Sequence, residues 1–359
     1  MRLSDIYGPK VFLASRPWEG TSDWLTAGGR NFDALTGRHI GFAGDLPDIC
    51  HAATVSPTGL HLMRDAGLVP TPNIVSYRTR DEYRDRVRAL VGAGNKGFSV
   101  YRVPEDVLPV AASVVAPELI GFLNNKANLA ELAPAEGVAD RTTMSGAEFA
   151  RRAPAMALPF VAKVATDEAN GGGRDVVLCT KRRYVRRAID RFRSAPLVLV
   201  EQFVDAVRND SFQFAVMPDG SVAGFPPTLQ LANYRGVHTS NLLDGSDPPP
   251  ESAQRVARAS AEKGGALGYR GICGFDILTD AKGRSYAVDL NYRICASTGM
   301  ALLAEDLLAA HKLPVAQLVT AYFGGSLDAF AKIAGTFISA GRLVPLSSFD
   351  AQMAGEGAG

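Results

Sequence analysis

The chain changes its pattern of secondary structure near residue 120, and this change restricts the possible folds more than any other feature of the sequence. Before that point, short apolar runs at 11–15, 39–44 and 98–103 are flanked by Gly or Pro, which is typical of buried strands. The segments 56–68 and 79–94 have the spacing and the end signals of helices. Strands that alternate with helices predict a parallel sheet covered by helices, so we expect an α/β domain here.

The middle of the chain, about 121–300, carries strands in pairs separated by short turns. The expected strands are 158–166, 174–179, 195–204, 211–217, 274–280 and 285–293. This pattern predicts antiparallel β structure with helices on one side, an α+β arrangement. The segment 301–345 is expected to be mostly helical, and the Gly/Ala-rich tail after Phe349 to be frayed. We therefore divide the chain into residues 1–120, 121–305 and 306–359.

One glycine pattern in the first domain resembles a dinucleotide fingerprint. Residues 92–97 spell GxGxxG. A dinucleotide site needs a strand before this pattern and a helix after it, whereas here the expected order is reversed. We interpret it as a loop from a helix to a strand.

Composition excludes several classes of protein. Hydrophobic residues make up 47% of the 359 residues and charged residues 21%, as in globular proteins and unlike disordered ones. The formal net charge of +1 gives no global field to attract nucleic acid or a membrane surface. No apolar run has the length of a membrane helix, and the first residues lack the pattern of a signal peptide. The four cysteines are far apart, so we expect reduced thiols and a cytoplasmic protein.

A basic helix, expected over 181–193, has two interpretations. Its seven Lys and Arg residues could contact nucleic acid, or they could form a solvated face. Its apolar residues Tyr184, Val185, Ala188, Ile189 and Phe192 fall on one side at helical spacing. With a balanced net charge, we favour the solvated face.

Two carboxylates face each other in the hairpin expected over 274–293. If Lys282 and Gly283 form its tip, Asp276 lies directly opposite Asp289, and Asn291 lies on the same face. Like charges at that spacing are destabilising, so removing one carboxylate should relieve repulsion in the metal-free protein. Oxygen ligands of this kind suit Mg²⁺ or Mn²⁺. The alternative is a solvated hairpin face with a register one residue off.

Two further segments could bind a nucleotide. Lys163 lies on an expected strand that leads into Gly171, Gly172 and Gly173, whose backbone N–H groups could close on phosphates. The alternative is an ordinary flexible hairpin. Glu201 interrupts the apolar strand 195–204 and, if buried, needs a partner, either an adenine edge or a lysine.

Taken in chain order, these pieces resemble the ATP-grasp superfamily of ligases over residues 121–300. The matching pieces are Asn125-Lys126, Lys163, Asn170–Arg174, Leu199–Val204, Asp276, and Asp289 with Asn291 and Arg293. The segments 122–132 and 341–351 resemble the pheganomycin-type peptide ligases, which carry a pre-ATP-grasp N-terminal domain. Two departures are the Asp residues at 276 and 289, where Glu is commoner, and the missing proline before Arg293.

The resemblance implies an ATP-grasp fold preceded by a Rossmann-like α/β domain, and a reaction. ATP would phosphorylate a carboxylate, and an amine would attack the acyl phosphate to give an amide, ADP and phosphate. Lys126 and Lys163 would hold phosphates under the glycine flap. Asp276, Asp289 and Asn291 would hold Mg²⁺ or Mn²⁺, and Arg293 would stabilise the transferred phosphoryl group. The implied adenine site consists of Glu201 and the backbone of Gln202, Phe203 and Val204.

Substrate residues are less constrained. Arg235 could clamp a carboxylate, and His238 could help to deprotonate the amine, but ordinary loop polarity explains both equally well. We expect amino acid or peptide substrates and allow a homodimer. A thiol or another acceptor in place of the amine, or a non-catalytic ATP-binding regulator, are the alternatives. The complete set of expected metal ligands argues against the regulator.

Overall fold

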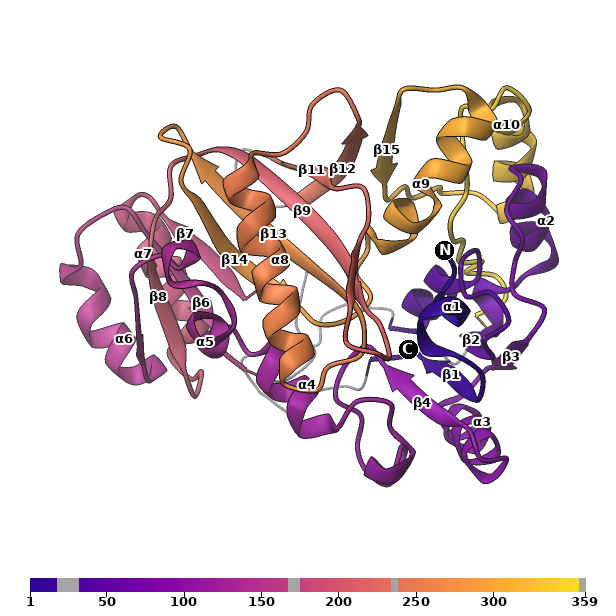
Figure 1. The fold of residues 1–359 in the computed structure, drawn as a ribbon, viewed down its shortest axis with the longest axis horizontal. Coiled ribbons are helices and arrows are strands. Elements are labelled where there is room, and N and C mark those ends of the chain that lie inside the picture. Colours follow the sequence, from indigo (N-terminus) through magenta and orange to yellow (C-terminus); the bar gives the residue numbers. More distant parts are fainter. Residues whose placement is uncertain (18–31, 167–174, 234–237, 355–359) are drawn as a thin grey trace.

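The computed structural model describes residues 1–17, 32–166, 175–233 and 238–354, and contains three sheets (Figure 1). The N-terminal sheet is parallel, in the order β3-β2-β1-β4. Its strands are β1 (Val11–Ala14), β2 (Asp48–His51), β3 (Ile74–Tyr77) and β4 (Lys96–Ser99). The helices of this part are α1 (Leu3–Tyr7), η1 (Asp33–His39), η2 (Ala52–Thr54), α2 (Pro57–Asp65), α3 (Arg80–Gly92) and η3 (Val110–Ala112). The predicted α/β domain is therefore confirmed.

Details of this domain differ from the prediction. Residues 39–44 form no strand: His39 ends η1, and the next residues turn, with Gly44 at φ +68°. The strand expected over 98–103 begins earlier, at Lys96, and ends at Ser99. The sequence analysis did not predict β2 or β3. The GxGxxG segment does connect the end of α3 to β4, as we interpreted it.

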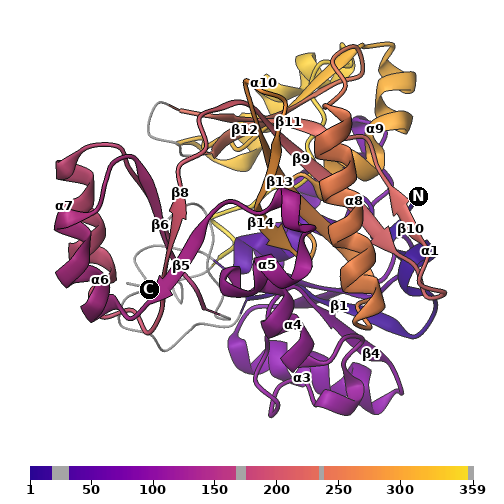
Figure 2. The same ribbon diagram turned by 60° about the vertical axis from the view of Figure 1, so that its left-hand side comes forward.

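The second sheet is small and antiparallel, in the order β5-β8-β6-β7. It comprises β5 (Arg141–Met144), β6 (Phe160–Val164), β7 (Val176–Cys179) and β8 (Val198–Gln202), with α6 (Gly146–Arg152), η6 (Ala153–Ala155) and α7 (Arg182–Phe192) beside it. It stands to one side of the molecule in Figures 1 and 2. Helix α7 buries Val185, Ala188 and Phe192 and exposes most of its arginines, which confirms the solvated basic face.

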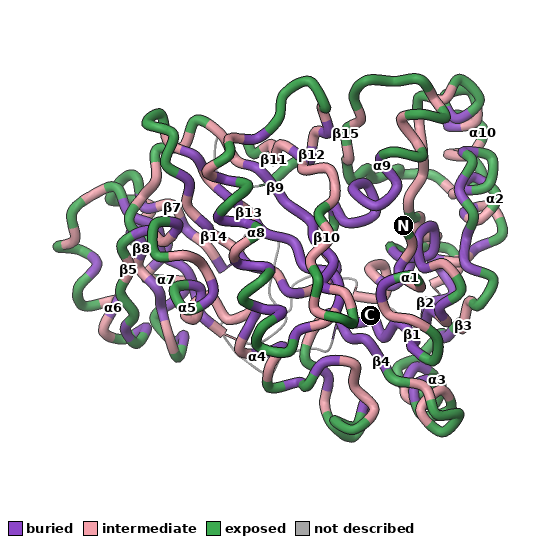
Figure 3. The backbone as a smooth tube through the Cα atoms, in the orientation of Figure 1, coloured by how far each residue is buried: buried purple, intermediate pink, exposed green. Residues whose placement is uncertain are grey.

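The third sheet is the largest, in the order β14-β13-β9-β11-β12-β15, with β10 paired to β9. Its strands are β9 (Ala206–Val216), β10 (Val222–Gly224), β11 (Thr228–Ala232), β12 (His238–Asp244), β13 (Gly271–Asp280), β14 (Ser285–Asn291) and β15 (Val315–Val319). The long helix α8 (Glu251–Ala266) packs on it, and β9 and β13 are buried along most of their length (Figure 3). Short elements lead into this part: α4 (Pro117–Asn124), η4 (Lys126–Asn128), α5 (Leu129–Leu132) and η5 (Ala135–Gly137).

The C-terminal region returns to the N-terminal domain. It comprises α9 (Thr298–His311), β15 and α10 (Leu327–Ser339), so the expectation of mostly helical structure missed β15. Ala334 and Ile338 of α10 pack on Leu62 of α2 and on Ala66, which directly follows that helix. The tail after Phe349 was expected to be frayed, but its first residue is held, because the Asp350 amide donates to the Ala53 carbonyl at 2.8 Å. Residues 355–359 lie outside the described residues. The division at about residues 120 and 305 remains our proposal.

The interior is shared between the first domain and the large sheet. One apolar cluster joins Leu3 and Leu13 to Phe275 and Ile294, whereas the small sheet has a separate cluster around Phe149 and Phe192. Because the small sheet has its own core, it forms a distinct packing unit beside the main body. No helix in the described residues has the length and apolar character needed to cross a membrane.

Candidate active site

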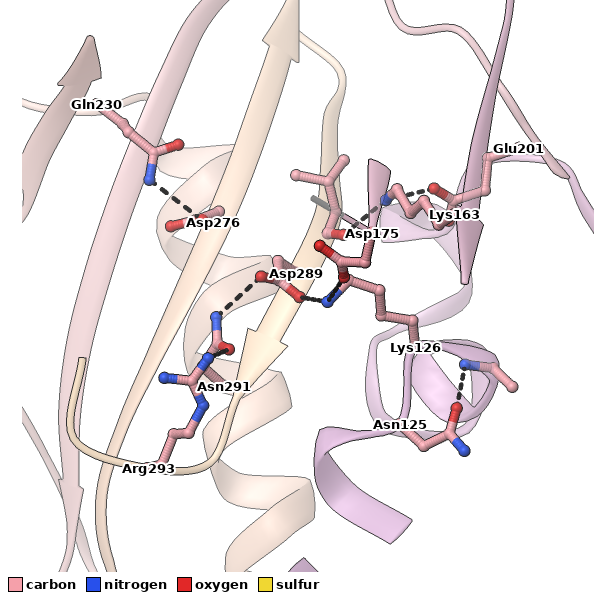
Figure 4. A network of polar contacts seen from close by, with 12 residues as sticks. Asn125, Lys126, Lys163, Asp175, Glu201, Gln230, Asp276, Asp289, Asn291 and Arg293 are labelled. Atoms are coloured by element: carbon pink, nitrogen blue, oxygen red, sulfur yellow. Dashed lines mark hydrogen bonds and ion pairs between the residues drawn. The ribbon is translucent and has the colours of Figure 1, made fainter. Parts of the chain in front are cut away.

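The two acidic residues of the β13–β14 hairpin lie directly opposite each other, as predicted. Near the tip, the pairing differs from the predicted symmetry, because Ile277 pairs with Ala287. A bulge that leaves Val288 unpaired restores the predicted register, and Asp276 then faces Asp289. Figure 4 shows both carboxylates on neighbouring strands, with Asn291 beyond them.

Their surroundings separate the pKa values of the two carboxyl groups. Burial and the charge of Asp289 raise the pKa of Asp276 to about 6, although Gln230 donates a hydrogen bond to its Oδ2 at 3.2 Å. Burial also disfavours the charged form of Asp289, but the ammonium of Lys126 outweighs it and lowers that pKa to about 2. Asp289 is therefore ionised, whereas Asp276 forms no ion pair with any residue that the structure describes.

Lys126 lies between two carboxylates. Its Nζ is 2.9 Å from Asp289 Oδ1 and 3.2 Å from Asp175 Oδ2 (Figure 4). Burial alone would lower its pKa, but these two charges raise it above the usual value. The backbone before it is fixed, because Asn125 Oδ1 accepts a hydrogen bond from the Ala127 amide at 3.0 Å. The structure thus brings a predicted phosphate lysine onto a predicted metal ligand.

Lys163 is buried on β6, and its Nζ donates a hydrogen bond to the Val288 carbonyl at 2.8 Å. That carbonyl belongs to the bulged residue, so the bulge connects the hairpin to the small sheet. Lys163 also forms an ion pair with Glu201, whose other oxygen pairs with Arg141. Of the two partners that the sequence allowed for Glu201, the lysine is the one found. The adenine contacts of Glu201, Gln202, Phe203 and Val204 stay a prediction.

Arg293 extends from the end of β14 toward the N-terminal domain. Its Nη2 donates to Asn291 Oδ1 at 2.5 Å, and Asn291 Nδ2 donates to Asp289 Oδ2 at 3.1 Å. The guanidinium carbon of Arg293 lies 4.8 Å from the centre of the Tyr101 ring. The three residues of the final motif therefore form one connected chain.

The site fits a divalent cation on chemical grounds. Asp276 and Asp289 supply carboxylate oxygens on one face, and Asn291 on that face carries an amide oxygen, which accepts a hydrogen bond from Arg293 in this structure. The described part of the chain has no cluster of three or more His, Cys, Asp or Glu that could hold a metal. The candidate set is thus two carboxylates and an amide, which suits Mg²⁺ or Mn²⁺ better than zinc.

His238 lies near the same face. It begins β12, one of its ring nitrogens is 2.8 Å from Asn241 Oδ1, and its charge acts on Asp276. Arg235 and the glycines Gly171, Gly172 and Gly173 lie outside the described residues.

Sequence reasoning missed three residues of this network. Asp175 holds Lys126, Arg141 holds Glu201, and Gln230 holds Asp276. A signal existed only for Asp175, which directly follows the glycine-rich segment. Arg141 and Gln230 reach the site through strand pairings between distant segments, which spacing does not reveal.

Two family models match this chain. The model described as the L-aspartate–L-methionine ligase N-terminal domain matches residues 2–121, and the model of the ATP-grasp part of the same ligase matches residues 139–291. Together they include Lys163, Glu201, Asp276, Asp289 and Asn291, whereas Lys126 lies between them.

Solved structures show the same fold at low identity. An N5-carboxyaminoimidazole synthetase from Staphylococcus aureus, complexed with ADP, is 9% identical, with a TM-score of 0.53 over 83% of this chain and 74% of that one. A carboxyaminoimidazole ribonucleotide synthase from Aspergillus clavatus, complexed with ATP, is 15% identical, with a TM-score of 0.52 over 74% of each chain. An L-amino acid ligase from Bacillus licheniformis is 14% identical, with a TM-score of 0.50 over 80% of this chain and 68% of that one.

Proposed function

Because this chain belongs to the ATP-grasp ligases and matches both domain models of the L-aspartate–L-methionine ligase family, we propose that it joins L-aspartate to L-methionine. The predicted superfamily, ATP-grasp fold and ADP-forming amide ligase activity are confirmed. The resemblance to peptide ligases left both substrates open. The matching family names two amino acids, L-aspartate and L-methionine. The identity of the two amino acids is the proposed part.

One observation supports the assignment of this site above all others. Lys126, Lys163, Asp276 and Asp289 come from three separate segments, yet an ion pair, a hydrogen bond and strand pairing bring them into one partly buried network. A metal–triphosphate complex requires cations for its phosphate oxygens and carboxylates for its metal. The two lysines and the two aspartates are groups of these kinds. In the protein without ATP, carboxylates neutralise the two lysines. When ATP binds, its phosphate oxygens replace these carboxylates as partners of the lysines.

The reaction follows from these positions. A carboxylate oxygen of L-aspartate attacks the γ-phosphorus of ATP, the bond to the β–γ bridging oxygen breaks, and ADP leaves. The methionine amine then attacks the acyl carbon, loses a proton, and displaces phosphate. Lys126 and Lys163 hold phosphate oxygens, and Arg293 stabilises the charge on the transferred phosphoryl group. Most of the rate enhancement then comes from positioning and charge neutralisation.

A magnesium ion held by Asp276, Asp289 and Asn291 would supply charge neutralisation for the phosphates. His238 would accept the proton of the amine, with Asn241 orienting its ring. Arg235 remains the predicted clamp for a substrate carboxylate, and the glycines at 171–173 the predicted cover of the triphosphate. We place the reaction in the cytoplasm, since all four cysteines are free thiols.

The test is a reaction of the purified protein with ATP, Mg²⁺, L-aspartate and L-methionine, followed by mass spectrometry and ADP measurement. The proposal predicts the dipeptide and one ADP for each amide. Omission of either amino acid should remove the product, and each of the other amino acids in place of methionine should give less. Formation of a thioester with an added thiol, or ATP binding without any product, would contradict it.

A further inference from the structure

A buried glutamine of the large sheet lies in the same row of residues as Asn291. Asn291 of β14 is paired with Gly274 of β13, and Gly274 is paired with Gln213 of β9. Residues directly opposite each other in neighbouring strands share one face of a sheet. Gln213 is only 1% exposed, and it is not part of the network of lysines and aspartates. A buried amide needs hydrogen-bond partners, and those of Gln213 lie beyond the end of β14.

The missing side chain of Gly274 leaves space for the Gln213 amide. A Cβ at Gly274 would lie 2.8 Å from Cys295 Sγ and even closer to the amide of Gln213. These separations are shorter than van der Waals contact, so a larger residue at position 274 would have to displace both groups. The side chain of Gln213 therefore passes over Gly274 to residues 293–298, which we call the Arg293 loop.

Both ends of the Gln213 amide are bonded to the Arg293 loop. Its Oε1 accepts a hydrogen bond from Thr298 Oγ1 at 2.7 Å, and its Nε2 donates one to Ser297 Oγ at 3.2 Å. Ser297 is the N-cap residue of α9, a position where a serine hydroxyl usually accepts from its own helix, but it makes no such bond here. Its hydroxyl binds Gln213 instead, so the start of α9 is attached to β9.

From Thr298, hydrogen bonds lead back to the backbone of Arg293. Thr298 Oγ1 accepts a hydrogen bond from the Cys295 amide at 2.8 Å. Cys295 Sγ donates to the Arg293 carbonyl at 3.4 Å. Thr298 is fully buried, and its single hydroxyl connects Gln213 to the backbone two residues after Arg293. The interior of the large sheet thus fixes the Arg293 loop.

The guanidinium of Arg293 has a separate support. It donates to Asn291 Oδ1, as Figure 4 shows, and lies 4.8 Å from the centre of the Tyr101 ring. The Asn291 oxygen is also a candidate ligand of the cation, so metal binding competes with this bond. The bonds of Gln213 and Thr298 involve no candidate ligand. They can therefore support Arg293 both with and without the metal.

We propose that Gln213 and Thr298 are positioning residues for Arg293, which fix the loop from which its guanidinium reaches the transferred phosphoryl group. This inference rests on the proposed function, because it acts through the role of Arg293 in that reaction. Donors that stabilise a transition state must be held at fixed positions, and a displacement of about 1 Å can lower the rate by about 100-fold. A loosened Arg293 loop should therefore lower kcat more than it weakens substrate binding.

Steady-state kinetics of Thr298→Val and Thr298→Ser test this role, because valine keeps the shape of the side chain and serine keeps its hydroxyl. Thr298→Val should lower kcat for dipeptide formation by about 10- to 100-fold, with nearly unchanged KM values for ATP and both amino acids. Thr298→Ser should recover most of the loss, and Gln213→Met should resemble Thr298→Val. A wild-type kcat in Thr298→Val, or a loss of kcat/KM that lies entirely in KM, would overturn the inference.

Thr279→Val is the matched control. Thr279 is another buried threonine of the large sheet, and its hydroxyl lies 2.9 Å from Ser285 Oγ near the tip of the β13–β14 hairpin, away from the Arg293 loop. In thermal unfolding this variant should also lose stability, but its kcat should equal that of the wild type. If Thr279→Val lowers kcat as much as Thr298→Val does, lost stability explains both effects and the inference fails.

A double-mutant cycle with Arg293→Ala separates positioning of Arg293 from a general structural role. Arg293→Ala removes the guanidinium that the loop positions, so Thr298→Val should cause no further loss of kcat in that background. If the two losses multiply instead, Thr298 acts through another group, and the inference is wrong.

Hydrogen exchange measured by mass spectrometry distinguishes this inference from the proposed function, because it does not depend on the substrates. The amides of the Arg293 loop should exchange faster in Thr298→Val than in the wild type, and at the wild-type rate in Thr279→Val. Equal exchange in Thr298→Val and the wild type contradicts the positioning role. Absence of any dipeptide from the wild type contradicts the proposed function, whatever the exchange rates are.

Discussion

Side chains of the site neutralise one another before any ligand binds. Lys126 lies against Asp289 and Asp175, and Lys163 against Glu201. The position of Asp276 opposite Asp289 was predictable from the sequence, because a short turn joins their two strands. The sequence could not reveal that Lys126 would lie 2.9 Å from Asp289, because that contact joins segments more than 160 residues apart. The repulsion expected between the two carboxylates is therefore largely offset.

Asp289→Asn tests the metal assignment. We expect kcat for amide formation to fall by about 100-fold or more, as when an electrostatic group of a reacting centre is removed. The fold should persist, since Lys126 keeps Asp175 as a partner, but no gain in stability is expected, because the attraction of Lys126 is lost together with the repulsion of Asp276. Enzyme assays and thermal unfolding measure the two effects. Asp190→Asn, on the exposed face of α7, is the control, and near-wild-type turnover with unchanged Mg²⁺ dependence in Asp289→Asn would refute the assignment.

Asp48 gives a prediction about pH. It is fully buried in β2, neither of its carboxyl oxygens has a hydrogen-bond partner among the described residues, and burial raises its pKa to about 8. Since the folded state holds this proton more tightly than the unfolded chain, its stabilising effect is complete below about pH 4 and is lost as the pH rises toward 8. The free energy of unfolding should fall over that range by up to about 1.4 kcal/mol per pH unit.

Asp48→Asn should remove that dependence. Urea unfolding at pH 5 and pH 8 should show a smaller loss of stability in the variant than in the wild type. Asp45→Asn, at an exposed position just before β2, serves as the control and should follow the wild type. Parallel profiles for Asp48→Asn and the wild type would contradict a neutral buried carboxyl.

Helix α8 shows how one element depends on a glycine that helix propensity disfavours. A Cβ at Gly264 would lie 2.1 Å from the Tyr292 ring, which is buried at the end of β14. The glycine therefore allows α8 to approach the strand that carries Asp289 and Asn291. By contrast, Gly335 in α10 has no atom within 4 Å of an added Cβ.

The same substitution should have opposite effects in the two helices. Gly335→Ala should stabilise the protein by about 1 kcal/mol, from helix propensity. Gly264→Ala should destabilise it by about 1–3 kcal/mol, because the added methyl group must displace a packed ring. Denaturant unfolding of both variants measures the difference, and a stabilised Gly264→Ala would show that α8 is packed less tightly than described.

Prediction from sequence succeeded for elements with a strong local signal. The apolar runs of β1, β6, β8 and β13 and the periodic apolar faces of α3 and α7 were identified. The strands β2 and β3 are only four residues long and contain polar residues, and β15 lies in a segment that looked helical. These short strands exist because neighbouring strands supply their hydrogen bonds, a tertiary effect that propensity does not contain.

In the molecule as a whole, later parts of the chain pack against the N-terminal domain. Helix α10 packs on α2, the Phe349 ring lies 6.1 Å from that of His51, and Tyr101 meets Arg293. The N-terminal domain thus contacts both the C-terminal region and the end of β14, where the final motif lies. Composition predicted globular domains, but not that α10 and Phe349 would pack on the first of them.

The central claim is that this closed site transfers the γ-phosphoryl group of ATP to a carboxylate. The most direct test uses L-aspartate labelled with ¹⁸O in its carboxyl groups, with L-methionine, ATP and Mg²⁺, and mass spectrometry of the products. The account predicts ADP and phosphate in equal amounts with the dipeptide, and one ¹⁸O in each released phosphate. Label in AMP, with pyrophosphate as the second product, would contradict it.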